Sequence, residues 1–432
     1  MRALLLAVLL APAAVAQVSA IERDPAPAVS GLDPASPAGR AFSEGWAAYT
    51  RLRLAEAVDL WREAVDQSDV PGVRAWLAEA LRRLGQGTED QALVREAIGE
   101  ARRVLAADHC NAQAHLVLAD AYNCQFLAWP GASPDSTARH LQRAAACDPD
   151  DGNAWMAGWT EAVRLGDADT EAEALVRLRD LGFWTPPVMA FARWTLANVP
   201  PDAVLLTNGD ADTVPIRIAQ AVEGLQPDVA VVNVPLLELP EVARQTADTH
   251  GLPLPDSVET HVSRFDPRGS AATREGRIYS LRDAVIDTWL AASASGALGR
   301  PLVAAITIDP DVLGTKTEVV DRAAHLAPAA AFGFDAEAAR TAVAGLDGAA
   351  FVGPLVSPDD RSPVRRAVPF DPAALVLFQA LQTAVSLAQG GDAAGAESVY
   401  EAAVTFATDA GRADDPLVAV ARQWIDDARD AP

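Results

Sequence analysis

The stretch VLLTNGDADTVPIRIAQAVEGLQPDVAVVNV, residues 204–234, contains two short apolar runs with a helical segment between them. The runs are flanked by Asp, Pro or Gly and are rich in branched apolar residues, which is typical of buried strands. Between them, Ile216, Ala219 and Val222 recur at helical spacing. A strand, a helix and a second strand in this order predict a parallel crossover unit.

The residues that follow extend this unit into a small α/β domain. A helical stretch at residues 280–296 leads into a third apolar run, PLVAAITI, at residues 301–308, and residues 348–357 could supply another short strand. No glycine-rich phosphate-binding fingerprint follows any of these runs. We therefore predict a domain that is Rossmann-like in the loose sense, with its ligand side outside the carboxyl ends of the strands.

Helical hairpins are expected on both sides of this domain. In the first pair of helices, Gly45, Ala57, Trp61 and Ala64 are spaced by 12, 4 and 3 residues, and the same spacing recurs near the C-terminus in Ala384, Ala396, Tyr400 and Ala403. The pattern resembles the tetratricopeptide repeat, in which a small residue lets two helices approach and a bulky one fills the groove between them. Stacked hairpins of this kind leave a concave face that commonly binds peptide or protein segments.

The predicted fold class is therefore α plus α/β, with tetratricopeptide-like helical hairpins flanking a small Rossmann-like parallel-sheet domain. The expected order is a signal peptide (1–20), a flexible linker (21–40), helical repeats (41–198), the α/β domain (199–357) and C-terminal helices (370–430).

The N-terminus has the features of a secretory signal peptide. Arg2 precedes an apolar core from Leu4 to Leu10, and small residues follow at 14–16 and 18–20. This run is shorter than the roughly 20 residues that a bilayer span needs, and no later segment is long and apolar enough. We expect an exported protein, periplasmic or secreted, without an integral membrane span.

The net charge limits the possible partners, and the cysteine content limits the possible disulfides. The chain has 35 basic and 59 acidic residues, a net charge of −24. Such a surface repels phosphate backbones, so nucleic acid is not expected as a partner. Cys110, Cys124 and Cys147 allow one disulfide and a free thiol, or no disulfide, and the sequence leaves the pairing open.

The turn TNGDADTVP, residues 207–215, follows the first predicted strand and has four competing interpretations. Asp212 or Thr213 caps the next helix, with Pro215 in its first turn. Alternatively, Asp210 and Asp212 form a DxD pair that holds a divalent metal ion. As a third interpretation, the two carboxylates act as an acid–base pair in hydrolysis. As a fourth, the turn lines a small polar pocket that binds a peptide or sugar without chemistry.

Polar residues at neighbouring strand ends are the candidate ligand-binding residues. Asp309 and Asp311 follow the third apolar run and would converge with the turn if the first and third strands are neighbours. A resident cofactor is not expected, although a divalent metal ion stays open. The candidates are Asn208, Asp210, Asp212, Thr213, Asn233 and Asp309, with Asp210 and Asp212 as the metal-ligand pair.

The stretch around this turn resembles a known family. Residues 203–241 are similar to the soluble C-terminal part of bacterial multi-spanning membrane proteins related to the protein O-mannosyltransferases. The shared features are a T-N-G-D-x-D-T-x-P turn, a helix ending in E-G-x-x-x-D-V and a strand ending in N-x-x-L-L; they are carried here by Thr207, Asn208, Gly209, Asp210, Asp212, Thr213, Pro215, Glu223, Gly224, Asp228, Val229, Asn233, Leu236 and Leu237. The resemblance implies a fold and a shared pocket. It does not imply sugar transfer, because the catalytic residues of that family's membrane module have no counterpart in this sequence.

We expect binding rather than catalysis. The leading hypothesis is a scaffold or adaptor of the bacterial envelope that holds a protein or peptide partner at its helical repeats. The alternative is a ligand- or metal-binding α/β domain with transferase or hydrolase activity on a glycosyl or phospho substrate, using the TNGDADT turn. A third hypothesis is a structural part of a larger envelope assembly. The oligomeric state stays open.

Overall fold

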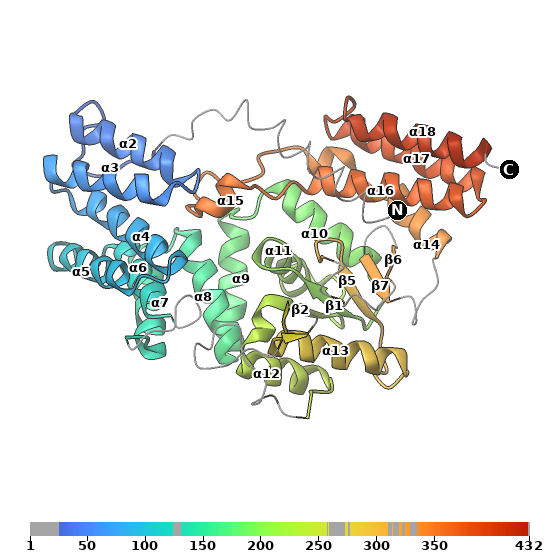
Figure 1. Cartoon of the computed structure of the whole chain (residues 1–432), viewed down its shortest axis with the longest axis horizontal. Helices are drawn as coiled ribbons and strands as arrows, with labels where there is room; N and C mark the ends of the chain where they lie inside the picture. The colour runs from blue at the N-terminus through green and yellow to red at the C-terminus, as the bar shows by residue number, and fades with distance from the viewer. Residues whose placement is uncertain are drawn as a thin grey trace. The chain divides into compact units, whose positions relative to one another are not determined.

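A computed structural model describes residues 26–123, 131–256, 258, 273–274, 277–309, 313, 319–321, 325–328 and 335–430 of the chain (Figure 1). Contacts divide the chain into two compact units. The hairpin unit comprises Met1–Asn123, Asp135–Cys147 and Ser362–Ala367, and the sheet unit comprises Cys124–Pro134, Asp148–Arg361 and Val368–Pro432. The predicted signal peptide lies outside the described residues.

Helices build the hairpin unit. They are α2 (Pro37–Tyr49), α3 (Leu54–Gln67), α4 (Pro71–Gly87), α5 (Gln91–Ala107), α6 (Ala112–Tyr122), α7 (Pro134–Cys147) and the short α15 (Pro363–Ala367). Of these, α2, α5 and α6 begin with a side-chain cap. Ser36 accepts the Gly39 N–H at 3.0 Å, and Asp90 and Asn111 cap α5 and α6 in the same way. These caps pair backbone N–H groups that have no partner within the helix. Helix α2 begins at Pro37, inside the residues expected to be a linker.

The first hairpin has the small-to-large packing that the spacing predicts. Ala57, Trp61 and Ala64 of α3 are fully buried, and the Trp61 Nε1–H donates to Phe42 O of α2 at 3.1 Å. A Cβ on Gly45 would lie 2.3 Å from Trp61 Nε1. Only glycine therefore lets α2 approach the indole ring this closely.

Replacing Gly45 with alanine is expected to destabilise the hairpin unit by about 1–3 kcal/mol, because the added methyl group overpacks the Trp61 ring. Gly99→Ala in α5 is the matched control, since no atom lies within 4 Å of the Cβ that it adds. That substitution should stabilise the protein by about 0.5–1 kcal/mol through helix propensity. Urea unfolding measures both, and two changes of the same sign would contradict the packing argument.

Buried charges connect α2, α4 and α6. Glu79 of α4 is 5% exposed and accepts from the Tyr49 hydroxyl of α2 at 3.0 Å and from Arg82 at 2.7 and 2.9 Å. Arg82 also lies 3.2 Å from the Asp120 carboxylate of α6. Burial acts to raise the pKa of Glu79, but Arg82 and Arg83 outweigh it and lower the pKa to about 2. Charge-assisted hydrogen bonds thus hold the three helices together.

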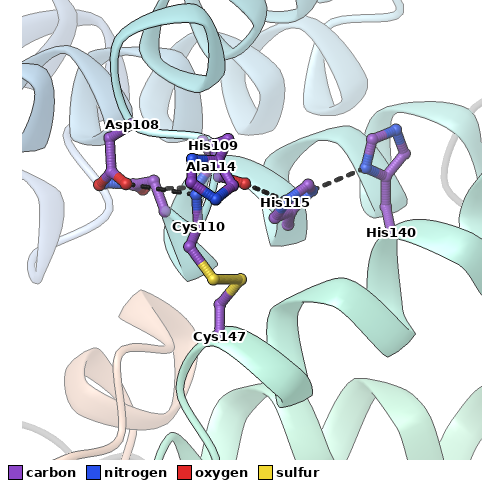
Figure 2. The surroundings of a disulfide bond; sticks show 8 residues. Asp108, His109, Cys110, Ala114, His115, His140 and Cys147 are labelled. Atoms are coloured by element: carbon purple, nitrogen blue, oxygen red, sulfur yellow. Dashed lines mark hydrogen bonds between the residues drawn. A yellow bond between two sulfur atoms is a disulfide. The ribbon is translucent and has the colours of Figure 1, made fainter.

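A disulfide closes one end of the α6–α7 hairpin (Figure 2). Cys110, which precedes α6, is bonded to Cys147 at the end of α7. The structure thereby gives the pairing that the sequence left open. Cys124 lies outside the described residues.

The rings of two histidines beside this disulfide are joined by a hydrogen bond. His115 Nδ1 of α6 lies 2.9 Å from His140 Nδ1 of α7, and His115 Nε2 lies 3.2 Å from His109 O (Figure 2). A carbonyl only accepts, so His115 Nε2 carries the hydrogen and the Nδ1 of the neutral ring accepts from His140 Nδ1. Burial lowers the pKa of both rings, and the neighbouring His115 and Arg139 add to the shift of His140, whose pKa is about 4.

We expect the hairpin unit to lose stability as the pH falls from 6.5 to about 4. Both pKa values are lower in the folded state than in the unfolded chain, so the stabilisation is complete above 6.5 and disappears as the rings take up protons. Thermal unfolding between pH 7.5 and 4 measures the decline. His140→Asn keeps a donor near the position of Nδ1 but cannot titrate. The stability of this variant should therefore fall less steeply with pH than that of the wild type. An equal slope in the variant would rule out the histidine pair as the cause.

The sheet unit alternates helices and strands. Its elements are α8 (Gly152–Leu165), α9 (Ala168–Asp180), α10 (Pro186–Asn198), β1 (Val204–Thr207), α11 (Asp210–Ala221), β2 (Ala230–Asn233), the 3-10 helix η2 (Val234–Glu238), α12 (Pro240–His250), β3 (Thr273–Arg274), β4 (Arg277–Ile278), α13 (Leu281–Ala294), β5 (Leu302–Ala305), β6 (Val319–Asp321), β7 (His325–Pro328), α14 (Ala336–Ala344), the 3-10 helix η5 (Gly348–Phe351), α16 (Pro372–Gln389), α17 (Ala393–Asp409) and α18 (Pro416–Asp430).

Three parallel strands form the centre of this unit. The sheet has the order β2-β1-β5-β7-β6, in which β1 pairs in parallel with both β2 and β5, while β7 and β6 add antiparallel. The predicted strand–helix–strand unit is confirmed, and so is the coarse fold class, α plus α/β with helical hairpins and a small parallel sheet. β3 and β4 form a separate two-stranded ladder.

Helices cover both faces of the three strands. On one face, Leu206 and Val232 pack with Trp289 of α13 and other residues of α12 and α13. On the other face, Leu205 packs with Ile216 of α11 and with residues of α10. Each strand is buried on both sides, which explains why its sequence is a continuous apolar run rather than an alternating one.

Arg300 holds the amino ends of the three parallel strands together. Its guanidinium group donates to the backbone oxygens of Asp202 and Asp228 at 2.7 and 2.9 Å, and to the Asp202 carboxylate at 2.6 Å. It also donates to His250 O, at the end of α12, at 3.4 Å. This residue fixes the edge of the sheet opposite the predicted ligand side.

The predicted strand at residues 348–357 is wrong. These residues begin with the 3-10 helix η5, and no strand lies among them. The additional strands are β6 (Val319–Asp321) and β7 (His325–Pro328); β7 pairs antiparallel with β5, and β6 pairs antiparallel with β7. Those strands depend on long-range pairing and carry no local apolar run that sequence patterns detect.

The C-terminal helices bury the residues that share the spacing of the first hairpin. Ala384 of α16 and Ala396, Tyr400 and Ala403 of α17 are buried, and the Tyr400 hydroxyl donates to Val418 O of α18 at 3.1 Å. Within the described residues, α16 alone has the length and apolar composition to cross a membrane. That evidence is weak, because 67% of the helix is buried and the core helix of a soluble protein passes the same test.

Candidate functional site at the carboxyl ends of the parallel strands

The TNGDADTVP turn joins β1 to α11 at the carboxyl edge of the sheet. Gly209 is the N-cap of α11, with a φ of 149° that L side chains rarely adopt. Helix α11 begins at Asp210, so the expected position of Pro215 in the first turn is wrong; the proline is the sixth helical residue. Because proline has no N–H, it leaves the Ala211 carbonyl without its usual helical partner.

Asp212 caps α11 from within its first turn. The carboxylate is 3% exposed and accepts the backbone N–H groups of Asn208 at 2.8 Å and Gly209 at 3.0 Å. The Thr307 hydroxyl, just after β5, also donates to it. Burial raises the pKa of Asp212, and the donors from Asn208, Thr307 and Gly209 act in the opposite direction. The capping interpretation therefore agrees with the geometry, with Asp212 at the third helical position.

Thr307 shows that two strand ends meet at this site. β1 and β5 are neighbours in the sheet, which is the condition on which convergence of the first and third strands depends. Sequence patterns did not select Thr307, although a hydroxyl directly after a buried apolar run is the available signal. The residue ties the end of β5 to the start of α11.

A second set of polar groups lies beside this one, on the α11 face of the sheet. The Thr207 hydroxyl donates to Val232 O at 2.9 Å, so the Thr213 hydroxyl, 2.7 Å away, donates to Thr207. Asn233 pairs with Thr207 across the parallel ladder, and paired residues point to the same face. Asn233 is 8% exposed, and its Oδ1 has no hydrogen-bond partner in the described part of the chain.

The two carboxylates of the DxD sequence lie in different environments. Asp210 is exposed and Asp212 is buried, since residues two apart on a helix point about 200° away from each other. Both oxygens of Asp212 already accept hydrogen bonds. Asp309 follows β5 and is exposed, whereas Asp311 lies outside the described residues. Among the described residues, no group of three His, Cys, Asp or Glu side chains is arranged to hold a metal ion.

A further buried carboxylate at this edge was missed by sequence patterns. Glu238 at the end of η2 is 2% exposed and accepts the Ser280 hydroxyl at 2.8 Å. Ser280 is also the N-cap of α13, so the start of that helix is tied to the end of η2. The contact depends on residues far apart in the sequence, and no local pattern marks it.

Replacing Asp212 with asparagine is expected to destabilise the sheet unit by about 1–3 kcal/mol, because a buried donor loses its acceptor. The Asn208 and Gly209 N–H groups point at different oxygens of Asp212, and an amide group supplies only one. Asp210→Asn, at the exposed carboxylate, should change stability by less than about 0.5 kcal/mol. Equal effects in a chemical denaturation experiment would contradict the assigned capping geometry.

A surface cavity lies in the hairpin unit. It has a volume of about 530 Å³ and is lined by residues 52–56, which cover the α2–α3 turn and the start of α3, and by the C-terminal end of α4, including Arg83, Leu84 and the C-cap Thr88. Arg53 and Glu56 at its rim form an ion pair at 2.7 Å. The lining combines apolar side chains with charges of both signs.

The site and the strands around it define a helix-covered parallel α/β module with a buried carboxylate at its carboxyl edge. Residues 188–260 match the family model described as TMEM260-associated domain 2. The match spans β1, the TNGDADT turn, α11, β2 and α12, together with most of α10. No curated protein matches the chain.

Proposed function

We propose that this protein is an exported scaffold that binds a protein or peptide partner through its hairpin unit. The observation that carries the proposal is the packing of Gly45 against the fully buried Trp61. This close approach supports hairpins of the tetratricopeptide type, whose stacked arrays serve as binding surfaces. The buried charges that join α2, α4 and α6 support a stacked arrangement as well.

Export of the protein is part of the same proposal. The Cys110–Cys147 disulfide supports it, because disulfides persist mainly in oxidising compartments such as the periplasm. The apolar N-terminal segment supports it from the sequence.

Site-specific photo-crosslinking in cells tests the scaffold proposal. A photoreactive residue replaces Arg53, at the rim of the hairpin-unit cavity, and in a matched strain it replaces Arg179 of α9. Both arginines are partly exposed and paired with a near neighbour, Glu56 and Asp180 respectively. We expect a discrete crosslinked protein from position 53 and none from position 179.

The crosslinked protein is then purified and titrated against the purified scaffold by calorimetry. Binding that Gly45→Ala weakens and Asp210→Asn leaves intact would support the hairpin unit as the binding surface. The same crosslinks from both positions, or no binding of the purified partner, would refute the proposal.

A second candidate function is supported by the unpartnered carbonyl of Asn233. This acceptor is buried beside Thr207 at the carboxyl edge, where α/β proteins commonly bind ligands. A glycosyl or phospho ligand with hydroxyl donors suits it. Thermal unfolding with Mg²⁺, Mn²⁺, Ca²⁺ and nucleotide-sugars tests this second function. A ligand at a hundredfold excess over its Kd adds about 2.7 kcal/mol to the free energy of unfolding. A rise in the unfolding temperature of the wild type that Asn233→Ala abolishes would establish a ligand site. An unchanged unfolding temperature would exclude these ligands.

The relationship to the mannosyltransferase-related membrane proteins is proposed for the fold and the pocket alone. The family match at residues 188–260 supports a shared α/β module. Sugar transfer is not part of the proposal, because none of the site residues carries over from that family's catalytic module.

A further inference from the structure

One short segment of the chain belongs to the hairpin unit although the residues on both sides of it belong to the sheet unit. This segment, Ser362–Ala367, is called the strap here. It has the sequence SPVRRA and includes the short helix α15. The Arg365 N–H donates to the Ser362 hydroxyl at 3.4 Å, which begins the turn.

The strap places an arginine on the aromatic centre of the hairpin unit. The guanidinium carbon of Arg366 lies 5.6 Å from the ring centre of Trp46 in α2, within the range of a cation–π contact. Trp46 in turn packs edge-on against Trp76 of α4, with ring centres 5.1 Å apart, and stacks on Tyr49 at 5.7 Å. Trp46 is 2% exposed with Arg366 over its ring.

The strap covers this ring without completing its hydrogen bonds. Trp46 Nε1 is buried and has no hydrogen-bond partner in the part of the chain that the structure describes. Buried N–H groups in native proteins are nearly always paired. A segment that brings a carbonyl or carboxylate oxygen to Nε1 therefore makes a contact that the strap lacks.

The outer side of the strap is open to solvent. Val364 and the adjoining Val368 are 54% and 71% exposed, the latter being the most exposed large hydrophobic side chain in the described residues. The flanking residues are anchored within the sheet unit. Arg361 N–H donates to Asn153 Oδ1 at 3.1 Å, and Phe370 packs edge-on to Phe191, with ring centres 5.2 Å apart.

We propose that the strap is an intramolecular occupant of a partner-binding surface at Trp46, and that the partner is a short arginine-containing peptide segment that displaces it. This inference rests on the proposed scaffold function. The strap belongs to the same chain as Trp46, which gives it a high effective concentration there, so a weak contact suffices to hold it. The partner binds in its place through an arginine over Trp46 and an oxygen at Nε1.

Fluorescence anisotropy with a labelled peptide tests the proposal in the full mature chain. The peptide spans residues 359–370, DDRSPVRRAVPF, and the protein is either wild type or a variant in which residues 362–367 are replaced by GSGSGS. We expect the peptide to bind the replaced-strap protein at least tenfold more tightly than the wild type. Arg366→Ala in the peptide should weaken binding several-fold, and Arg365→Ala, the matched control, should weaken it less.

Equal binding to both proteins, or no binding to a replaced-strap protein whose circular dichroism and disulfide are intact, would overturn the strap proposal. The crosslinking experiment at position 53 reports separately on the scaffold function. A partner captured there, without any binding of the peptide, would support the scaffold function and refute the strap proposal. Tighter binding of the crosslinked partner to the replaced-strap protein than to the wild type would support both.

Discussion

Replacing Glu79 with glutamine is expected to lower the free energy of unfolding by about 3–5 kcal/mol, the usual cost of removing one partner from a buried ion pair. The side chain keeps its size, so the loss is one of charge and hydrogen bonding. Arg82, 2% exposed, would retain only Asp120 as a close acidic partner among the ion pairs in the described residues. The Tyr49 hydroxyl would also lose its charged acceptor.

Two comparisons isolate this effect. Glu96→Gln removes an exposed ion pair with Arg62 at 2.8 Å and should cost less than about 1 kcal/mol. The pH dependence provides the second comparison. The folded-state pKa of Glu79 is about 2, below its ordinary value of 4.5. The stabilisation that ionised Glu79 gives the folded state is therefore complete above pH 4.5 and is lost as the pH falls through 2. The difference between wild type and variant should shrink on acidification, and a cost below about 1 kcal/mol at pH 7 would contradict the network.

Removing the disulfide with Cys110→Ser/Cys147→Ser is expected to lower the free energy of unfolding by about 3–4 kcal/mol. The bond joins residues separated by 37 positions, and the reduced unfolded chain gains the freedom of that loop. Chemical denaturation of the oxidised wild type and the double variant measures the difference.

A reductant provides the control for the disulfide prediction. It should bring the wild type to the stability of the double variant and leave the variant unchanged. An equal loss in both proteins would place the effect outside the Cys110–Cys147 bond. A difference below about 1 kcal/mol would show that the α6–α7 hairpin is held by packing alone.

The parallel strands could be predicted from the sequence because their apolar runs are local. Residues 204–207, 230–233 and 302–305 are buried on both faces, and each run needs only its own composition to be recognised. β6 and β7 could not be predicted in this way. β7 pairs with β5, and β6 pairs with β7. Both pairings depend on contacts across the chain, and strand propensity varies with such contacts.

The candidate site was predictable in position and not in detail. The rule that ligands lie at the carboxyl ends of parallel strands selected Asn208, Asp212 and Asn233. The exposures of Asp210 and Asp212 could not be read from the DxD spacing, because they depend on where α11 begins. Thr307 and Glu238 become part of the edge only when strands and helices that are distant in the sequence are brought together.

The sequence by itself determined the three parallel strands, the helix between the first two of them, and the small-to-large spacing around Gly45 and Trp61. These features follow from periodicity and residue size, which act over a few residues. The tertiary structure alone decided that Cys110 pairs with Cys147, that Asp212 is buried while Asp210 is exposed, and that the strap lies on Trp46. Each of those outcomes depends on the desolvation or proximity of groups from separate elements, and both quantities exist only after the chain has folded.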